Sequence, residues 1–257
     1  MNTNRFGKAS RRTVLGAGLA VAATAAAAGL RPRVAKGQGS ASLHVVLLGD
    51  SIFDNGQYVG SGPDVVQQLR DGLPSGARAT LVAVDGSVTS GVRAQLQIIP
   101  ADTSHFAISV GGNDALHYSK VLDEKARTVS DALDKLAEVR ERFEQDYRAM
   151  LDAVVAKGLP VAVCTIYDAR FPDLRQRRQA SVGLTIFNEC ITREASARGL
   201  ALIDLRLICN RDQDLANTIE PSVIGGAKIA SAIREYLSEY DSSKGRSEVF
   251  VETGSKT

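Results

Sequence analysis

Five short apolar runs, each followed by a segment with helical spacing, constrain the fold of this sequence most. The runs cover 43–49, 79–84, 105–110, 160–166 and 201–205 and are rich in β-branched residues. Nearly continuous apolar character is typical of strands that are buried on both faces of a sheet. The helical segments cover about 63–72, 89–98, 128–157, 174–198 and 223–238. This alternation predicts an α/β fold, a flavodoxin-like three-layer sandwich with a five-stranded parallel sheet.

The first forty residues differ in composition from the rest of the chain. They contain seven basic residues and no acidic residue, arranged around an apolar run from Val14 to Leu30. This order is typical of a cleavable signal peptide, and the run is too weakly hydrophobic for a stable membrane span. The segment SRRTVLG at 10–16 resembles a twin-arginine export signal, which implies the twin-arginine export machinery as a partner.

We therefore expect three parts along the chain: a signal peptide and linker at 1–40, one domain at 41–240 and a flexible tail at 241–257. The expected location is periplasmic or secreted, in a bacterium, with no membrane span after cleavage. Without the leader the chain has 24 basic and 29 acidic residues, a net charge of −5. It also lacks a basic patch interleaved with aromatic residues, so we expect no nucleic-acid partner.

Cysteine and glycine patterns give no sign of a metal or a cofactor. Cys164, Cys190 and Cys209 are not spaced as metal ligands, and no glycine-rich loop has phosphate-binding spacing. We expect no cofactor and no metal site.

Polar motifs follow the first three predicted strands, where the carboxyl ends of parallel strands form a binding edge. They are GDS at 49–51, Gly86 and GGND at 111–114. A serine hydroxyl at Ser51 is exposed at that edge. The backbone N–H groups of Ser51 and Gly86 and the amide of Asn113 can then stabilise one developing oxyanion, each by a few kcal/mol.

These three motifs resemble those of the SGNH hydrolase superfamily, the GDSL-type lipases and esterases, over about 43–236. The resemblance implies a flavodoxin-like fold and hydrolysis of a small acyl ester, either a small molecule or an ester carried on a glycan. It also implies an acyl-Ser51 intermediate and an oxyanion hole formed by Gly86 and Asn113.

The base is the point at which the sequence departs from that family. The family's Asp-x-x-His before the last helix is replaced here by Asn217-x-x-Glu220. Three interpretations stay open. In the first, Glu220 is the base and its carboxylate accepts a hydrogen bond from the Asn217 amide. In the second, His117 on the loop after the third strand is the base. In the third, the protein is a catalytically impaired binding protein on the same fold. An unperturbed glutamate is a weaker base than histidine at neutral pH.

Further polar residues lie at the same edge of the predicted sheet. Asp54, His117, Asp168 and Arg170 are candidates for lining the substrate pocket. Asp54 equally suits a role in capping the turn after Ser51, and Arg170 equally suits an ion pair with a neighbouring acid.

Overall fold

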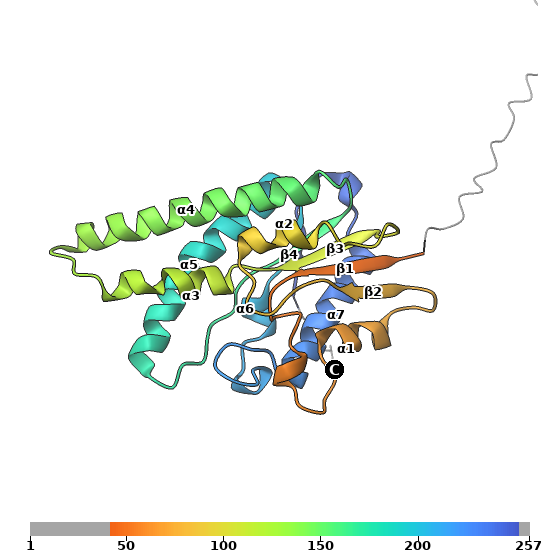
Figure 1. Ribbon diagram of the computed structural model, residues 1–257, viewed down its shortest axis with the longest axis horizontal. Helices are drawn as coiled ribbons and strands as arrows, with labels where there is room; N and C mark the ends of the chain where they lie inside the picture. Colours follow the sequence, from red (N-terminus) through yellow and green to blue (C-terminus); the bar gives the residue numbers. More distant parts are fainter. Residues whose placement is uncertain (1–41, 252–257) are drawn as a thin grey trace, which may run out of the picture. The chain divides into compact units, whose positions relative to one another are not determined.

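The computed structural model describes residues 42–251, so the predicted signal peptide lies outside the described residues. Within them, six parallel strands form one sheet in the order β2-β1-β3-β4-β5-β6 (Figure 1). The strands are β1 (His44–Gly49), β2 (Arg78–Leu81), β3 (His105–Ser109), β4 (Val161–Cys164), β5 (Ala201–Ile203) and β6 (Val249–Phe250). This strand order confirms the predicted flavodoxin-like α/β fold.

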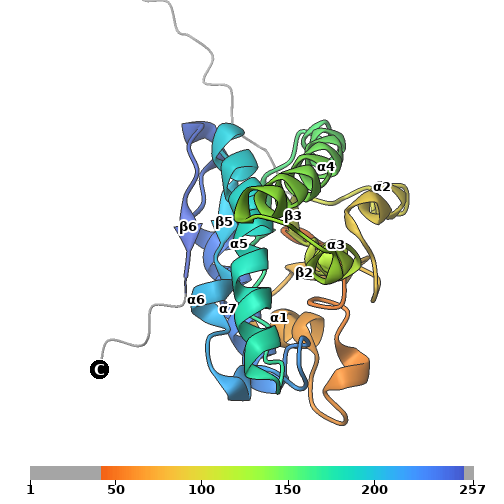
Figure 2. The ribbon, with the colours of Figure 1, turned by 90° about the vertical axis from the view of Figure 1, so that its left-hand side faces the viewer.

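Helices connect the strands and cover both faces of the sheet (Figure 2). The α-helices are α1 (Val65–Gly72), α2 (Val92–Gln95), α3 (Gly112–Tyr118), α4 (Val129–Val155), α5 (Leu174–Ala197), α6 (Leu205–Ile208) and α7 (Val223–Glu239). Short 3-10 turns are η1 (Gly56–Tyr58), η2 (Thr89–Gly91), η3 (Ser119–Asp123), η4 (Asp212–Asp214) and η5 (Ser242–Lys244).

Two apolar layers hold these helices against the sheet. Along β1, Val45 and Leu47 belong to a cluster with the buried residues of α1 and α7, whereas Val46 and Leu48 belong to a cluster with those of α4 and α5. All four side chains are fully buried. Because successive side chains of a strand point to opposite faces, a strand covered on both faces must be apolar throughout.

The structure corrects the sequence-based reading in two places. The tail predicted to be flexible from 241 contains η5 and β6, which pairs in parallel with β5 and buries Phe250. A two-residue strand after a polar stretch gives no periodic signal, so the sequence predicts five strands and not six. The segment after β3, which the sequence predicts to be a loop, contains α3, so Asn113 and His117 lie on a helix.

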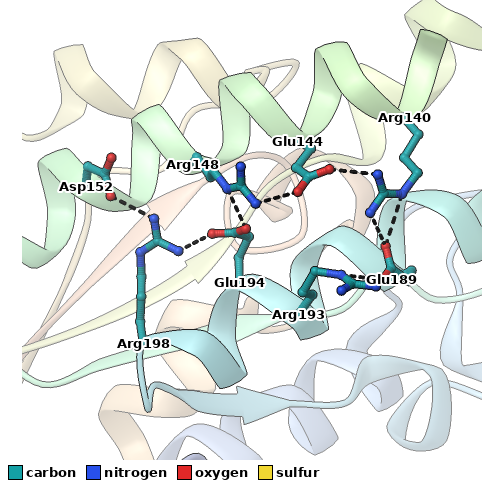
Figure 3. A network of polar contacts seen from close by, with 8 residues as sticks. All are labelled: Arg140, Glu144, Arg148, Asp152, Glu189, Arg193, Glu194 and Arg198. Carbon is teal, nitrogen blue, oxygen red and sulfur yellow. Dashed lines mark hydrogen bonds and ion pairs between the residues drawn. The ribbon is translucent and has the colours of Figure 1, made fainter. Parts of the chain in front are cut away.

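The long helices α4 and α5 are joined by an extended network of ion pairs (Figure 3). At its centre Glu194 of α5 is almost fully buried, and it accepts from Arg148 of α4 at 2.7 Å and pairs with Arg198. The other members are Arg140, Glu144, Asp152, Glu189 and Arg193. A network of this kind fixes the spacing of the two helices more firmly than isolated surface pairs do.

No helix between residues 42 and 251 is long and apolar enough to cross a membrane.

Candidate active site

Ser51 lies two residues after the end of β1, on a backbone that is tightly fixed. At Gly49 the backbone has a φ of +121°, and a Cβ there would lie 1.8 Å from the carbonyl oxygen of Ser109 on β3. Only glycine is compatible with this approach. Gln95 clamps the same residue, because its Oε1 accepts from Gly49 N at 2.8 Å and its Nε2 donates to Gly49 O at 2.7 Å. The Ser51 hydroxyl is therefore presented from a rigid strand end.

The Ser51 hydroxyl donates a hydrogen bond to Glu220, which comes from the loop before α7. Its Oγ lies 3.1 Å from Glu220 Oε1, and the two residues are only 6% and 5% exposed. Glu220 Oε2 is buried and has no hydrogen-bond partner among the described residues. Burial raises the pKa of the Glu220 carboxyl above its ordinary value of 4.5, and the hydrogen bond from Ser51 partly opposes this shift. The carboxylate is thus a stronger base than an exposed glutamate.

Asn217 holds the backbone of this loop and not the carboxylate. Its Oδ1 accepts hydrogen bonds from the backbone N–H groups of Ile219 and Glu220, both at 2.9 Å. The expectation that the Asn217 amide donates to the Glu220 carboxylate is therefore wrong. A short acceptor side chain that bonds the backbone two and three residues ahead is typical of an Asx turn, and here it orients the loop that carries Glu220.

Two residues that the sequence analysis did not single out fasten the Glu220 loop to its neighbours. The Tyr167 hydroxyl, after β4, donates to the carbonyl of Ile219 at 2.6 Å. Asn55, fully buried, donates to the carbonyl of Pro221 at 3.1 Å and accepts from Val65 N at 2.9 Å. Asn55 lies four residues after Ser51 in the sequence. Its burial, which makes hydrogen-bond partners necessary, is seen only in the structure.

Asn113 and Gly86 lie on neighbouring segments at the same edge of the sheet. Asn113 Nδ2 donates to the carbonyl of Ser87 at 3.0 Å, which leaves its second amide hydrogen available. Gly86 sits in an exposed turn with a φ of +75°. The adjacent Asp85 donates its backbone N–H to Asp54 Oδ2 at 2.9 Å, so Asp54 supports this turn. Within residues 42–251, the N–H groups of Ser51 and Gly86 make no hydrogen bond.

The remaining candidates are absent from the lining of the pocket that contains Ser51. His117 is exposed near the end of α3, and Asp168 is exposed after β4; neither lines the pocket that contains Ser51. Arg170 pairs with Asp212 at 3.1 Å and donates to the carbonyl of Asn210 at 2.6 Å. Gly86 and Asp54 are also outside the pocket lining. Asp168, Arg170 and Asp54 are thus loop-supporting or surface residues in this structure.

Ser51, Asn113 and Glu220 line one pocket of about 250 Å³. Asp50 lies beside them, accepts from Ile52 N at 3.1 Å and is almost fully buried. Burial raises the pKa of Asp50 well above its ordinary value, and Glu220 raises it further. The described residues contain no cluster of His, Cys, Asp and Glu that suits a metal ion.

Comparison with known proteins places this site in a family. The sequence model of the GDSL-like lipase/acylhydrolase family matches residues 47–223, from β1 to the start of α7. Curated protein sequences give no match. An extracellular lipase from Streptomyces rimosus is similar in structure, with 20% identity, a TM-score of 0.57 and coverage of 75% of this chain and 99% of the lipase.

Two further crystal structures are similar. A phospholipase A1 from Streptomyces albidoflavus has 18% identity and a TM-score of 0.53, with coverage of 76% and 99% of the two chains. An acetyl xylan esterase has 16% identity and a TM-score of 0.59, with coverage of 76% and 100%. At this identity the structures show a shared fold.

Proposed function

The chain belongs to the GDSL-like lipase/acylhydrolase family and is a hydrolase of ester bonds, and we propose that Ser51 is its nucleophile and Glu220 its base. The observation that carries this proposal is the 3.1 Å hydrogen bond from Ser51 Oγ to Glu220 Oε1. This distance is within the reach that a general base needs to take the proton of a nucleophile. No described histidine lines the pocket, so Glu220 replaces the family's usual base.

In the first half of the proposed reaction, Ser51 Oγ attacks the carbonyl carbon of the ester and its proton passes to Glu220 Oε1. The tetrahedral intermediate collapses when the ester C–O bond breaks. Glu220 then returns the proton to the departing alkoxide oxygen, which leaves as the alcohol. In the second half, water attacks acyl-Ser51, Glu220 takes its proton and passes it to Ser51 Oγ, and the carboxylic acid leaves.

The oxyanion of both intermediates is stabilised, in this proposal, by Ser51 N–H, Gly86 N–H and the Asn113 amide. Three observations support this assignment. The two backbone N–H groups make no hydrogen bond within the described part of the chain. Asn113 lines the Ser51 pocket, and its bond to Ser87 fixes α3 beside the Gly86 turn. Replacing Asn113 by alanine is expected to lower kcat by about 10²- to 10³-fold.

The proposed setting is outside the cytoplasm, with the substrate an acyl ester that is free or carried on a glycan. Export through the twin-arginine machinery rests on the SRRTVLG segment, which lies outside the described residues. The similar structures are a lipase, a phospholipase A1 and an acetyl xylan esterase, which supports an ester substrate.

The first experiment is hydrolysis of p-nitrophenyl esters by residues 41–257 between pH 4 and 9, with the variants Ser51→Ala and Glu220→Gln. We expect kcat to fall by at least about 10³-fold in Ser51→Ala and 10²-fold in Glu220→Gln. Because the pKa of Glu220 is raised, kcat/KM of the wild type rises with pH along an acid limb that lies above pH 4.5. Glu239→Gln, an exposed carboxylate on α7, is the matched control and keeps the wild-type rate.

Other results assign the site differently. Full activity in Glu220→Gln together with loss in His117→Asn would transfer the base to His117. A wild type no faster than Ser51→Ala on every ester, with no covalent adduct at Ser51 after treatment with an organophosphonate, would make the protein a binding protein on this fold.

A further inference from the structure

We propose that the pocket beside Ser51 binds the acyl chain of the substrate, so that the preferred substrate is an ester of a longer fatty acid, such as octanoate, rather than an acetate ester. This inference rests on the proposed role of Ser51. It revises the acyl group that the sequence alone led us to expect, which was small.

The pocket extends from Ser51 away from the sheet, between helices that lie beyond the carboxyl ends of the strands. In Figure 1, α3, the start of α4 and the start of α5 occupy this end of the domain. They supply nearly half of the lining residues, with apolar side chains from each helix. The apolar lining residues on these helices include Leu116 of α3, Leu136 and Val139 of α4, and Ala180, Leu184 and Phe187 of α5.

The charges in the lining show what kind of group fits. Asp50 and Glu220 are the only charged side chains among the residues that line the pocket, and both lie at the Ser51 end. The lining contains no Lys, Arg or His that would bind a phosphate, and its uncharged polar side chains are fewer than its apolar ones. A neutral, flexible hydrocarbon chain matches such a surface, because its burial is favourable without any hydrogen bond.

The volume shows that a small acyl group would not fill the pocket. A pocket of about 250 Å³ is far larger than the single position that one water-sized group occupies, about 10–15 Å³ in the same measure. An acetyl group would leave most of this apolar space unfilled. Beyond the lining residues, the Arg–Glu network joins α4 and α5 (Figure 3). It fixes the spacing of the two helices that border the pocket.

Gly183 offers a direct way to close the pocket. It lies on the lining face of α5 with Ala180, Leu184 and Phe187, and a Cβ built on it meets no atom within 4 Å. A larger side chain at this position therefore enters open space without a clash. It also replaces glycine in a helix interior, which favours the helix.

The test measures kcat/KM of the wild type for p-nitrophenyl esters from acetate to dodecanoate. Burial of each methylene is worth about a fourfold increase, so burial of at least half of the six additional methylenes of octanoate gives it an advantage over acetate of at least about fiftyfold. Gly183→Phe is expected to reduce the octanoate-to-acetate ratio at least about tenfold, and Gly183→Ala by less. Val182→Phe, the same bulk on an exposed neighbouring position, is the control and keeps the wild-type ratio.

The failure of this inference differs from the failure of the proposed function. Hydrolysis of acetate without a preference for longer chains, or a preference that Gly183→Phe does not alter, would overturn the acyl pocket and leave the Ser51 mechanism standing. If no ester is hydrolysed, the mechanism fails, and the pocket is tested by calorimetric binding of 2-octanone to Ser51→Ala. Binding that Gly183→Phe weakens at least about tenfold supports the pocket, and unaffected or absent binding overturns it.

Discussion

At the scale of single residues, the site contains a buried carboxylate, Glu220, and burial is unfavourable for its charged form. Glu220 is 5% exposed, one of its oxygens bonds Ser51, and the other has no partner in the described part of the chain. An ionised group in such a position destabilises the folded state. The same burial raises its pKa, so that, in the mechanism we propose, activity and stability oppose each other at this residue.

The Glu220→Gln variant separates the two effects. The folded-state pKa of Glu220 lies above its unfolded value, so the wild type loses stability as pH rises from 4.5 through the raised pKa. Glutamine carries no charge and escapes this loss. We expect Glu220→Gln to melt at a higher temperature than the wild type at pH 8 and at the same temperature below pH 4, measured by thermal denaturation. A melting-temperature difference that does not change with pH would contradict the assignment of a raised pKa to Glu220.

At the scale of elements, catalytic geometry depends on how loops from distant parts of the chain are fastened together. The Glu220 loop is held by Tyr167 from the β4 loop, by Asn55 from the β1 loop and by Arg170, whose backbone N–H donates to the carbonyl of Thr218 at 2.7 Å. Each bond joins a different strand end to the loop before α7. The position of Glu220 relative to Ser51 is therefore a property of several elements together.

Tyr167→Phe removes the hydroxyl group that donates to the carbonyl of Ile219, and so tests whether this hydrogen bond positions the Glu220 loop. The lost hydrogen bond to Ile219 is worth about 1 kcal/mol, so we expect kcat to fall by about fivefold to tenfold while KM changes little. Tyr236→Phe is the control, because the Tyr236 hydroxyl is buried in α7 and has no partner among the described residues. That variant should be as stable as the wild type or more stable by up to about 1 kcal/mol, with unchanged kcat. Equal kinetic effects of the two substitutions would refute a positioning role for Tyr167.

At the scale of the whole domain, the sheet ends at a short strand that the sequence had assigned to a tail. β6 follows α7 and pairs with β5 at the edge of the sheet, with Phe250 5% exposed and in ring contact with Tyr236 and Tyr240. The segment after 241 thus completes the apolar layer that contains α7. It therefore stabilises the side of the domain that contains α7, the helix that follows the Glu220 loop.

Phe250→Ala measures this contribution. Removal of a buried phenylalanine leaves a cavity, and we expect the free energy of unfolding to fall by about 3 kcal/mol in chemical denaturation. Val249→Ala, at a neighbouring position that is 58% exposed, should cost less than about 1 kcal/mol. Similar small effects at both positions would mean that β6 does not contribute to the stability of the domain in solution.

The sequence by itself determined the layered α/β fold, because strands buried on both faces must be apolar throughout and helices between them must be amphipathic. It also determined the edge at which Ser51, Asn113 and Glu220 lie, because the carboxyl ends of parallel strands meet there. Local patterns carried both kinds of information.

Only the tertiary structure decided which groups meet. The bond from Ser51 to Glu220 joins residues 169 positions apart, and the packing of a loop and a helix brings Glu220 to Ser51 and leaves His117 exposed. The role of Asn217, the fastening by Tyr167 and Asn55 and the apolar pocket between α3, α4 and α5 have the same origin. Side-chain contacts across the sheet edge are set by packing of elements distant in the chain, and no local periodicity encodes them.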